Sequence, residues 1–373
     1  MINQQRLLDT FLEIVQVDSE SKNERQIVDH MMKMLKGMGY EAIEDDAYSR
    51  VDVGAGNIIV TIPGTVKAAK KLLFTSHVDT VFPGKGIVPV IRDGYIYSQG
   101  NTVLGSDDKA GVAAILELLH VLKEQSIEHG GIQIVFTVGE ESGLLGAKFI
   151  DQSLLDADMG IALDGLGDVG TIVVQGPMQV SLKATITGKA AHAGVCPEAG
   201  ISAIEVAAAA ITNMKLGRID EETTANIGII KGGLATNIVC ETVEIDGEAR
   251  SLDRNKLQLQ VEDMRQALQQ SADSRGAKVE ITINEEYPEF HFDIQEDEIQ
   301  IVTQAMQKIG AKPDYVKSGG GSDASVFNGY GIKTINLGIG MEEVHSVNER
   351  IAVEQLNKAA EVLVALVETV KEF

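Results

Sequence analysis

Cysteine is almost absent from this chain of 373 residues, which contains only Cys196 and Cys240. The two cysteines form no Cys-x-x-Cys pair and are too few for the disulfide framework of a small secreted domain. The start of the chain lacks the apolar segment of a signal peptide, and no uninterrupted apolar stretch has the length of a membrane span. We therefore expect a cytoplasmic protein without a membrane partner.

Basic residues are scarce relative to acidic ones. The chain has 32 Lys and Arg against 55 Asp and Glu, and its formal net charge is −23. Such a charge disfavours phosphate backbones, so we expect no nucleic-acid partner, and a small substrate or a cation fits better. Hydrophobic residues make up 44% of the chain, which is ample for the cores of the roughly two domains that its length suggests.

Two hydrophobic patterns alternate along the first and last parts of the chain. Apolar runs with the length of buried strands lie at 57–62, 71–76, 132–138, 159–163 and 332–337. Helical periodicity is found at 4–17, 23–38, 108–124, 295–309 and 350–371. This alternation predicts an α/β domain whose sheet has helices on both faces.

The middle of the chain has a different order of elements. We expect strands at 178–187, 224–231, 237–250 and 278–286, and helices at 201–215 and 254–272. This β-α-β-β-α-β order is typical of a ferredoxin-like α+β domain, here inserted into the α/β domain. The predicted domains are therefore 1–176 with 289–373, and 177–288.

Histidine and carboxylate residues follow several of the predicted strands. One apolar run ends in His77 and Asp79, which can face the same side because residues i and i+2 of an extended chain do so. Two further strands end in Glu140 with Glu141 and in Asp164. Ligands bind outside the carboxyl ends of the strands in open α/β sheets, so we expect these residues on one edge.

Asp107, just before the predicted helix 108–124, and His345, shortly after the strand 332–337, are further candidates. Each candidate taken alone also has an ordinary structural interpretation. These are a helix cap at Asp107 or Ser106, a solvated turn at Glu140-Glu141, an Asx-turn at Asp164 and a surface or core position for His345.

The candidates taken together favour a metal centre. Carboxylates gathered closely repel and desolvate one another unless a cation neutralises them. Imidazole and carboxylate ligands without cysteine fit zinc best, with manganese or cobalt as substitutes. At least five candidate ligands exceed the three protein ligands of a usual mononuclear catalytic zinc site, so we expect two metal ions.

The motifs around these residues resemble the M20 family of dinuclear zinc peptidases, most closely its peptidase T branch of tripeptide aminopeptidases. The resemblance covers nearly the whole chain and rests on Ser76–Thr80, Leu104–Gly111, Gly139–Gly143, Asp164-Gly165, Gly188–Gly194 and Val344–Ser346. It implies a zinc-exopeptidase-like catalytic domain with a mixed sheet flanked by helices. The inserted domain would serve as a lid or dimerisation domain, which implies a possible homodimer.

The resemblance also implies a set of metal ligands for two Zn²⁺ ions in each subunit. Asp107 would bridge the two ions. His77 and Asp164 would complete one site, and Glu141 and His345 would complete the other.

Two carboxylates have implied roles beside the metals. Asp79 would hold His77 in the correct tautomer and raise its basicity. Glu140 would be the general base, which takes a proton from the metal-activated water and passes it to the leaving amine.

The inserted domain would contribute to substrate binding. His192 would help to stabilise the oxyanion, in this family often across the dimer interface, unless it is a partly buried structural histidine. Asn237 and Arg250 match positions that bind the substrate's carboxylate, although Arg250 could also have a plain surface or salt-bridge role. Gly320, in a run of three glycines, would let the backbone approach the substrate, with Ser322 or Asp323 capping the next helix.

The implied activity is zinc-dependent hydrolysis of an amide bond in short peptides, by aminopeptidase action on tripeptides. Sister branches with the same metal site remove acyl groups from N-acyl amino acids or cleave C-terminal residues, so a deacylase or carboxypeptidase remains an alternative. A catalytically silent small-molecule binding protein on this scaffold is another. Leu166 after Asp164-Gly165 and Ser251 after Arg250 depart from the peptidase T pattern and leave the tripeptide preference open.

Overall fold

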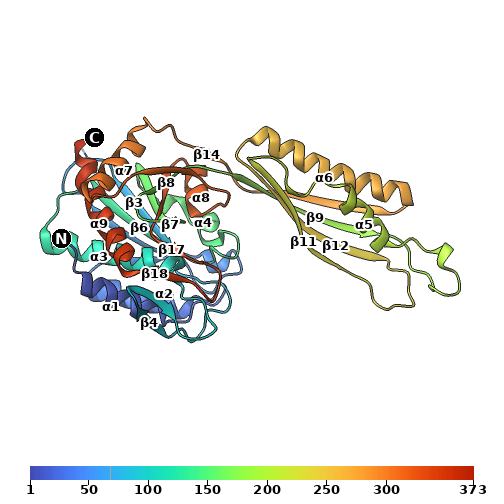
Figure 1. Cartoon of the computed structure of the whole chain (residues 1–373), viewed down its shortest axis with the longest axis horizontal. Coiled ribbons are helices and arrows are strands. Elements are labelled where there is room, and N and C mark those ends of the chain that lie inside the picture. The colour runs from blue at the N-terminus through green and yellow to red at the C-terminus, as the bar shows by residue number, and fades with distance from the viewer. Residues whose placement is uncertain (68) are drawn as a thin grey trace. The chain divides into compact units, whose positions relative to one another are not determined.

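The computed structural model describes residues 1–67 and 69–373, which divide into two compact units (Figure 1). Unit 1 comprises Met1–Val174, His291–Lys317 and Ser322–Phe373. Unit 2 comprises Gln175–Phe290 and the short segment Ser318–Gly321. Unit 1 contains all five of the predicted metal ligands, and unit 2 contains the inserted β-α-β-β-α-β segment.

A mixed sheet forms the centre of unit 1. Its strands are, in spatial order, β1 (Ala42–Glu44), β2 (Ile58–Pro63), β6 (Gly131–Thr137), β3 (Leu72–His77), β7 (Met159–Gly165), β16 (Lys333–Gly338), β8 (Thr171–Gly176) and β14 (Phe290–His291), with β15 (Asp314–Lys317) beside β8. The neighbours β6, β3, β7 and β16 are parallel, whereas β1, β2 and β8 pair in the antiparallel direction. Every residue of β3 and β6 is buried, as the continuous apolar runs of these strands predict.

Helices flank this sheet. They are α1 (Gln4–Val15), α2 (Arg25–Gly37), α3 (Ser106–Gln125), α4 (Leu145–Phe149), α7 (Asp297–Lys308), α8 (Asp323–Gly329) and α9 (Val353–Thr369). Helix α3 packs on β3 and β7 and also contacts α1 and α9, while α8 packs on β7 and β16. The predicted α/β class of this part of the chain, with a mixed sheet flanked by helices, is thereby confirmed.

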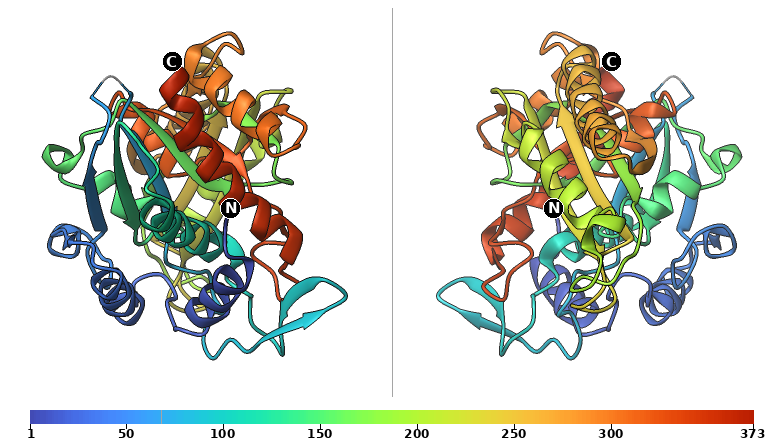
Figure 2. Two further views of the ribbon diagram at one scale, coloured as in Figure 1. Left: turned by 90° about the vertical axis from the view of Figure 1, so that its left-hand side faces the viewer. Right: turned by 90° about the vertical axis from the view of Figure 1, so that its right-hand side faces the viewer.

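Unit 1 also contains a small antiparallel sheet that the sequence did not predict. It has the order β17 (Met341–Glu342), β18 (Arg350–Ala352), β5 (Tyr95–Ser98) and β4 (Pro89–Arg92), and Figure 2 shows the β4–β5 hairpin extending from the rest of unit 1. The predicted helix 350–371 is wrong at its start, because Arg350–Ala352 pair with β5 and the helix begins at Val353. The loop between β17 and β18 carries His345.

Unit 2 is built on an antiparallel sheet in the order β10 (Gly217–Arg218), β11 (Thr223–Gly232), β12 (Thr242–Ser251), β9 (Met178–Thr187) and β13 (Lys278–Tyr287). Alternate residues of β9 are buried and pack with α5 (Ala203–Asn213) and α6 (Arg254–Arg275), which lie along the sheet in Figure 1. The predicted strand 237–250 starts too early, because β11 ends at Gly232, Gly233 has a φ of +85° and β12 begins only at Thr242. Before Thr242, Ile238 forms an isolated antiparallel bridge with His192.

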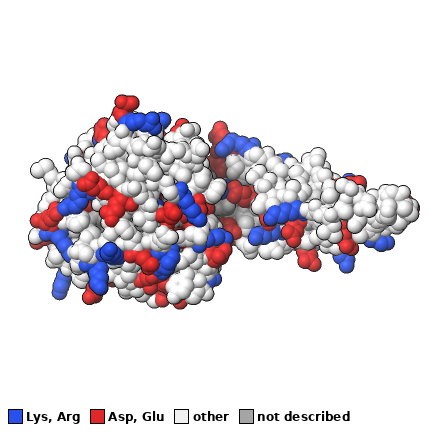
Figure 3. All heavy atoms as spheres, turned by 90° about the horizontal axis from the view of Figure 1, so that it is seen from below, with Lys and Arg blue, Asp and Glu red and all other residues white. Residues whose placement is uncertain are grey.

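The surface of the chain carries charges of both signs. On the face shown in Figure 3, acidic and basic side chains are interspersed. Among the described residues, none of the helices combines the length and the apolar character that crossing a bilayer requires.

Candidate metal centre and active site

The carboxyl ends of the parallel strands bring the predicted metal ligands to one edge of the sheet. His77 is the last residue of β3, and Asp164 lies at the end of β7. Glu140 and Glu141 follow β6, the parallel neighbour of β3. His345 reaches the same place from the β17–β18 loop, because its ring contacts Glu141.

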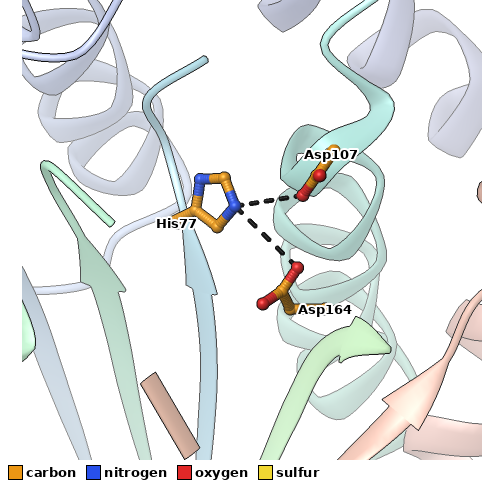
Figure 4. A group of neighbouring side chains, drawn as sticks. All are labelled: His77, Asp107 and Asp164. Atoms are coloured by element: carbon orange, nitrogen blue, oxygen red, sulfur yellow. Dashed lines mark hydrogen bonds and ion pairs between the residues drawn. The ribbon is translucent and has the colours of Figure 1, made fainter. Parts of the chain in front are cut away.

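A first group of ligand atoms surrounds the Nε2 atom of His77 (Figure 4). This nitrogen lies 3.1 Å from Oδ1 of Asp107 and 3.9 Å from Oδ1 of Asp164. The other ring nitrogen, Nδ1, is turned toward Asp79, 3.0 Å from its main-chain oxygen and 3.4 Å from its Oδ1. His77 thus presents one nitrogen to the carboxylates of the group and has the other held by Asp79.

A second group shares Asp107 with the first. The Nε2 atom of His345 lies 3.3 Å from Oδ2 of Asp107 and 2.8 Å from Oε1 of Glu141. Within each group, the ligand atoms lie within 4.8 Å of one another, and a further set of this kind joins His77 to Glu140 and Glu141. Each oxygen of the Asp107 carboxylate therefore faces a different histidine.

Asp107 does not cap helix α3. The N-cap position is Gly105, which makes no side-chain cap, and Asp107 has the non-helical angles φ −82° and ψ 101°. Its main-chain N–H donates a hydrogen bond to Oε1 of Glu349 at 3.0 Å. The main-chain N–H of Gly105 donates to the other oxygen of the same carboxylate. The capping interpretation is wrong for Ser106 as well, because its hydroxyl donates to Glu349 at 2.7 Å.

Asp79 links His77 to the segment that carries Glu140. Its carboxylate accepts hydrogen bonds from the main-chain N–H groups of Glu140 at 3.0 Å and Glu141 at 3.3 Å, and from the hydroxyl of Ser21 at 2.7 Å. Asp79 is completely buried. Sequence reasoning missed Ser21, which lies 58 residues before Asp79 and belongs to none of the motifs.

Burial and mutual repulsion dominate the electrostatics of the carboxylates. Burial, with the neighbouring carboxylates, raises the pKa of Glu140 and of Asp164 well above its usual range. Hydrogen bonds to Asp107 and Glu141 raise the pKa of His345 to about 10. For Asp107, burial acts to raise the pKa, but hydrogen bonds with His345 and His77 outweigh it and lower the pKa.

This arrangement fits a pair of metal ions. Imidazole nitrogens and carboxylate oxygens from distant segments converge, with more negative groups than the two histidines can neutralise, and a divalent cation would relieve that repulsion. Glu140 is buried at 9% exposure and the Glu141 side chain at 8%, so the solvated-turn interpretation of this pair is wrong. Asp164 faces His77, and His345 pairs with Glu141 although 53% of its side chain is exposed.

The remaining predicted residues lie in unit 2. His192 is exposed, and its Nδ1 accepts a hydrogen bond from the main-chain N–H of Gly194 at 3.1 Å. Asn237 is exposed in the loop between β11 and β12. Arg250 is paired with Glu248 at 3.0 Å, so the salt bridge that the sequence left open exists.

The glycine run lies beside Arg250. A Cβ atom at Gly320 would lie 3.9 Å from Nη1 of that arginine. Ser322 occupies the N-cap position of helix α8, as predicted, but its side chain makes no cap hydrogen bond and instead accepts one from Asn336 at 3.1 Å. Asp323 is also engaged elsewhere, because its carboxylate accepts a hydrogen bond from the hydroxyl of Thr137.

The sequence and fold of the chain are similar to those of known proteins. The sequence profile of peptidase family M20/M25/M40 matches residues 73–369. The chain is 49% identical to the uncharacterized protein YqjE of Bacillus subtilis, with 99% of both chains covered.

Two solved structures are similar over the full length. The aminopeptidase PepT of Bacillus cereus is 50% identical, with a TM-score of 0.89 and 99% of each chain covered. A tripeptidase of Staphylococcus aureus is 46% identical, with a TM-score of 0.93 and 100% of each chain covered. Because the family profile spans most of the chain and these relatives match it from end to end, the chain belongs to peptidase family M20/M25/M40.

Proposed function

We propose that this peptidase is a metal-dependent aminopeptidase that acts on short peptides, tripeptides in particular. The observation that carries the proposal is the carboxylate of Asp107, whose two oxygens face His77 and His345 in two adjoining groups of ligand atoms. The substrate class is supported by the full-length similarity to an aminopeptidase and a tripeptidase.

The ligand groups suggest which residues hold the metals. His77, Asp107 and Asp164 would hold one ion, and Asp107, Glu141 and His345 the other. Zinc, or manganese or cobalt in its place, would polarise the scissile carbonyl and increase the acidity of water when bound. Asp79 would keep His77 oriented through the contacts at Nδ1.

Glu140 is the proposed general base. Burial and nearby carboxylates raise the pKa of its side chain, which favours the acceptance of a proton from the attacking water. The main-chain N–H of Glu140 donates a hydrogen bond to Asp79, which holds the main chain at Glu140 in place. The carboxylate of Glu140 takes no part in that hydrogen bond. The same carboxyl group would then deliver the proton to the leaving amine.

Unit 2 is the proposed lid and dimerisation domain. His192 would donate a hydrogen bond to the developing oxyanion, and Asn237 and Arg250 would bind the substrate's terminal carboxylate. Two hydrogen bonds to Glu248, of 3.1 and 3.0 Å, hold the guanidinium of Arg250. The main chain at Gly320, next to this guanidinium, would leave room for the substrate.

A substrate panel tests the proposal. The purified protein, loaded with zinc, is assayed on free tripeptides, on the same tripeptides with an acetylated N-terminus, on N-acetyl amino acids and on N-blocked dipeptides. We expect release of the N-terminal amino acid from the free tripeptides only. Activity confined to blocked substrates would replace the aminopeptidase proposal with a deacylase or carboxypeptidase, and no hydrolysis of any substrate would favour a binding protein.

A further inference from the structure

Glu349 is a buried carboxylate that belongs to neither group of metal ligands, yet it binds the turn that carries Asp107. It is 2% exposed. Its Oε2 accepts hydrogen bonds from the main-chain N–H groups of Leu104 at 2.7 Å and Gly105 at 2.8 Å. Its Oε1 accepts from the hydroxyl of Ser106 at 2.7 Å and from the main-chain N–H of Asp107 at 3.0 Å.

These bonds explain why the side chain of Asp107 is free to face the histidines. The N–H groups before and at the start of a helix need acceptors from outside it, and a nearby carboxylate commonly provides them. Here the acceptor is Glu349, which comes from 242 residues further along the chain, so Asp107 need not serve as the cap. Hydrogen bonds to an ionised carboxylate are stronger than those between neutral groups.

Glu349 lies on the same loop as His345. The two residues contact Asp107 at different places, Glu349 at the main-chain N–H and His345 at Oδ2. The loop folds on itself through Ser346, whose main-chain oxygen accepts from the N–H of Glu349 at 3.1 Å. Any loss of the Glu349 contacts would therefore loosen both the turn and the loop that presents His345.

The two metal sites differ in how much they depend on this loop. His77 and Asp164 come from the ends of adjacent strands of the sheet, and His77 is only 2% exposed. His345 comes from a loop, and 53% of its side chain is exposed. The site that contains His345 is thus the one that Glu349 supports most.

We propose that Glu349 is a positioning residue that holds Asp107 and the loop of His345 in place. The metal ion held by Asp107, Glu141 and His345, the second ion, then binds tightly. This inference rests on the proposed metal centre. In Glu349→Gln the side chain keeps its shape, but one acceptor oxygen becomes an NH₂ group, which cannot accept from two of the four donors. We expect the affinity for the second zinc ion to fall about 10–100-fold, as is typical for groups that support metal ligands, and the first ion to be retained.

The test is zinc titration of the chelator-stripped, full-length protein by calorimetry, together with the thermal unfolding midpoint of the metal-free forms. Glu342→Gln is the matched control, because Glu342 lies on the same hairpin but pairs with Arg350 at 2.6 Å, whereas Glu349 binds the turn of Asp107. The wild type and the control should each bind two zinc ions, and the affinity for each ion should be the same in the two proteins. Glu349→Gln should take up the first normally and the second weakly, and wild-type affinity for both ions would overturn the inference.

If Glu349→Gln does not fold, a second variant tests the proposed role of Glu349. Ser106→Ala removes one of the four donors and should also lower the affinity for the second zinc ion, but by a smaller factor than Glu349→Gln. Zinc affinities equal to those of the wild type would overturn the inference. The wild type separates this question from the proposed function. If it binds two zinc ions and cleaves no peptide, the aminopeptidase proposal fails and the role of Glu349 stands, while uptake of fewer than two ions contradicts the metal centre itself.

Discussion

Asp79 and Glu140 are buried carboxylates at the same edge of the sheet with opposite electrostatic environments. Burial acts to raise both pKa values, but the hydrogen bond with His77 outweighs burial at Asp79 and lowers its pKa. At Glu140 burial prevails and the pKa is raised well above its usual range. Two carboxyl groups whose pKa values are driven apart are suited to different tasks, which agrees with the roles proposed for them, orientation of a histidine by Asp79 and proton transfer by Glu140.

Replacement of Glu140 tests its role as the base. Glu140→Gln should lower kcat by about 10²–10⁴-fold, because the amide cannot accept the proton. Zinc content, measured by mass spectrometry on the same sample, should remain at the wild-type value, since Glu140 is absent from the two groups that share Asp107. Wild-type turnover in this variant would contradict the proposed mechanism.

Asp323 gives a prediction about pH. It is 4% exposed, and burial raises its pKa to about 6 from the usual 3.8. Between about pH 4 and pH 6 the folded protein therefore holds a proton that the unfolded chain has lost, so this residue's contribution to stability falls as the pH rises through that window.

Asp323→Asn should remove this pH dependence. In urea unfolding at pH 4.5 and pH 7.5 with a chelator present, the wild type should lose more stability on going to the higher pH than the variant, by about 1–3 kcal/mol. Asp314→Asn, at an exposed position on β15, is the control and should behave as the wild type. An equal loss in Asp323→Asn and the wild type would show that Asp323 titrates normally.

Helix α3 lies close against the sheet at Gly111. A Cβ atom there would collide with the hydroxyl of Ser76 on β3 and lie 2.7 Å from Cβ of Leu163 on β7. Both neighbours stand next to metal-ligand candidates, since Ser76 precedes His77 and Leu163 precedes Asp164. The absence of a side chain at Gly111 thus allows the helix that begins near Asp107 to lie against the strands that end at the other ligands.

Gly111→Ala should destabilise the fold by about 1–3 kcal/mol, the usual effect of forcing an extra group into a packed core. Gly37→Ala is the matched control, because a Cβ at this position in α2 would meet nothing within 4 Å. That variant should be neutral or more stable by up to about 1 kcal/mol, since alanine favours the helix over glycine. Urea unfolding of the two variants makes the comparison, and equal midpoints would show that α3 can move away from the sheet.

The sequence predicts the elements that have a long and regular pattern. The buried strands 71–76 and 132–138 and the helix 254–272 are found within a few residues of their predicted bounds, because the strands are continuous apolar runs and the helix has a long helical periodicity. The short strands β4, β5, β17 and β18 are too brief to show such a pattern, and the sequence predicts a helix where β18 lies.

The same limit applies to the site. Residues that sit at strand ends or within compact motifs, such as His77 and Asp164, stand out because a local pattern leads to them. Glu349 contacts Asp107 and Ser21 contacts Asp79 through hydrogen bonds that span 242 and 58 residues, and no local periodicity signals contacts of that range. The structure is needed to find residues that support the ligands without being ligands.

At the scale of the whole molecule, the proposed chemistry and the proposed substrate binding belong to different units. Unit 1 contains the His and carboxylate groups, and unit 2 contains His192 and Arg250. Substitutions in the two units should therefore have separable kinetic effects.

Arg250→Lys should raise KM for a tripeptide by roughly tenfold or more, since a lysine cannot form the paired hydrogen bonds of a guanidinium with a carboxylate. Its kcat and zinc content should change little, because Arg250 is no metal-ligand candidate. Arg254→Lys is the control, an arginine at the start of α6 that pairs with Glu289 at 2.8 Å. A KM for Arg250→Lys equal to that of the control would argue against substrate binding by Arg250.

Zinc reconstitution of the chelator-stripped protein tests the central proposal most directly. Zinc is added in steps up to two equivalents per chain, and release of the N-terminal amino acid from a free tripeptide is followed at each step. We predict no turnover in the metal-free protein, and full activity in the wild type, but not in Glu140→Gln, once both ions are bound. Tripeptide hydrolysis by the metal-free protein, or none after two equivalents of zinc have bound, would contradict a metal-dependent aminopeptidase.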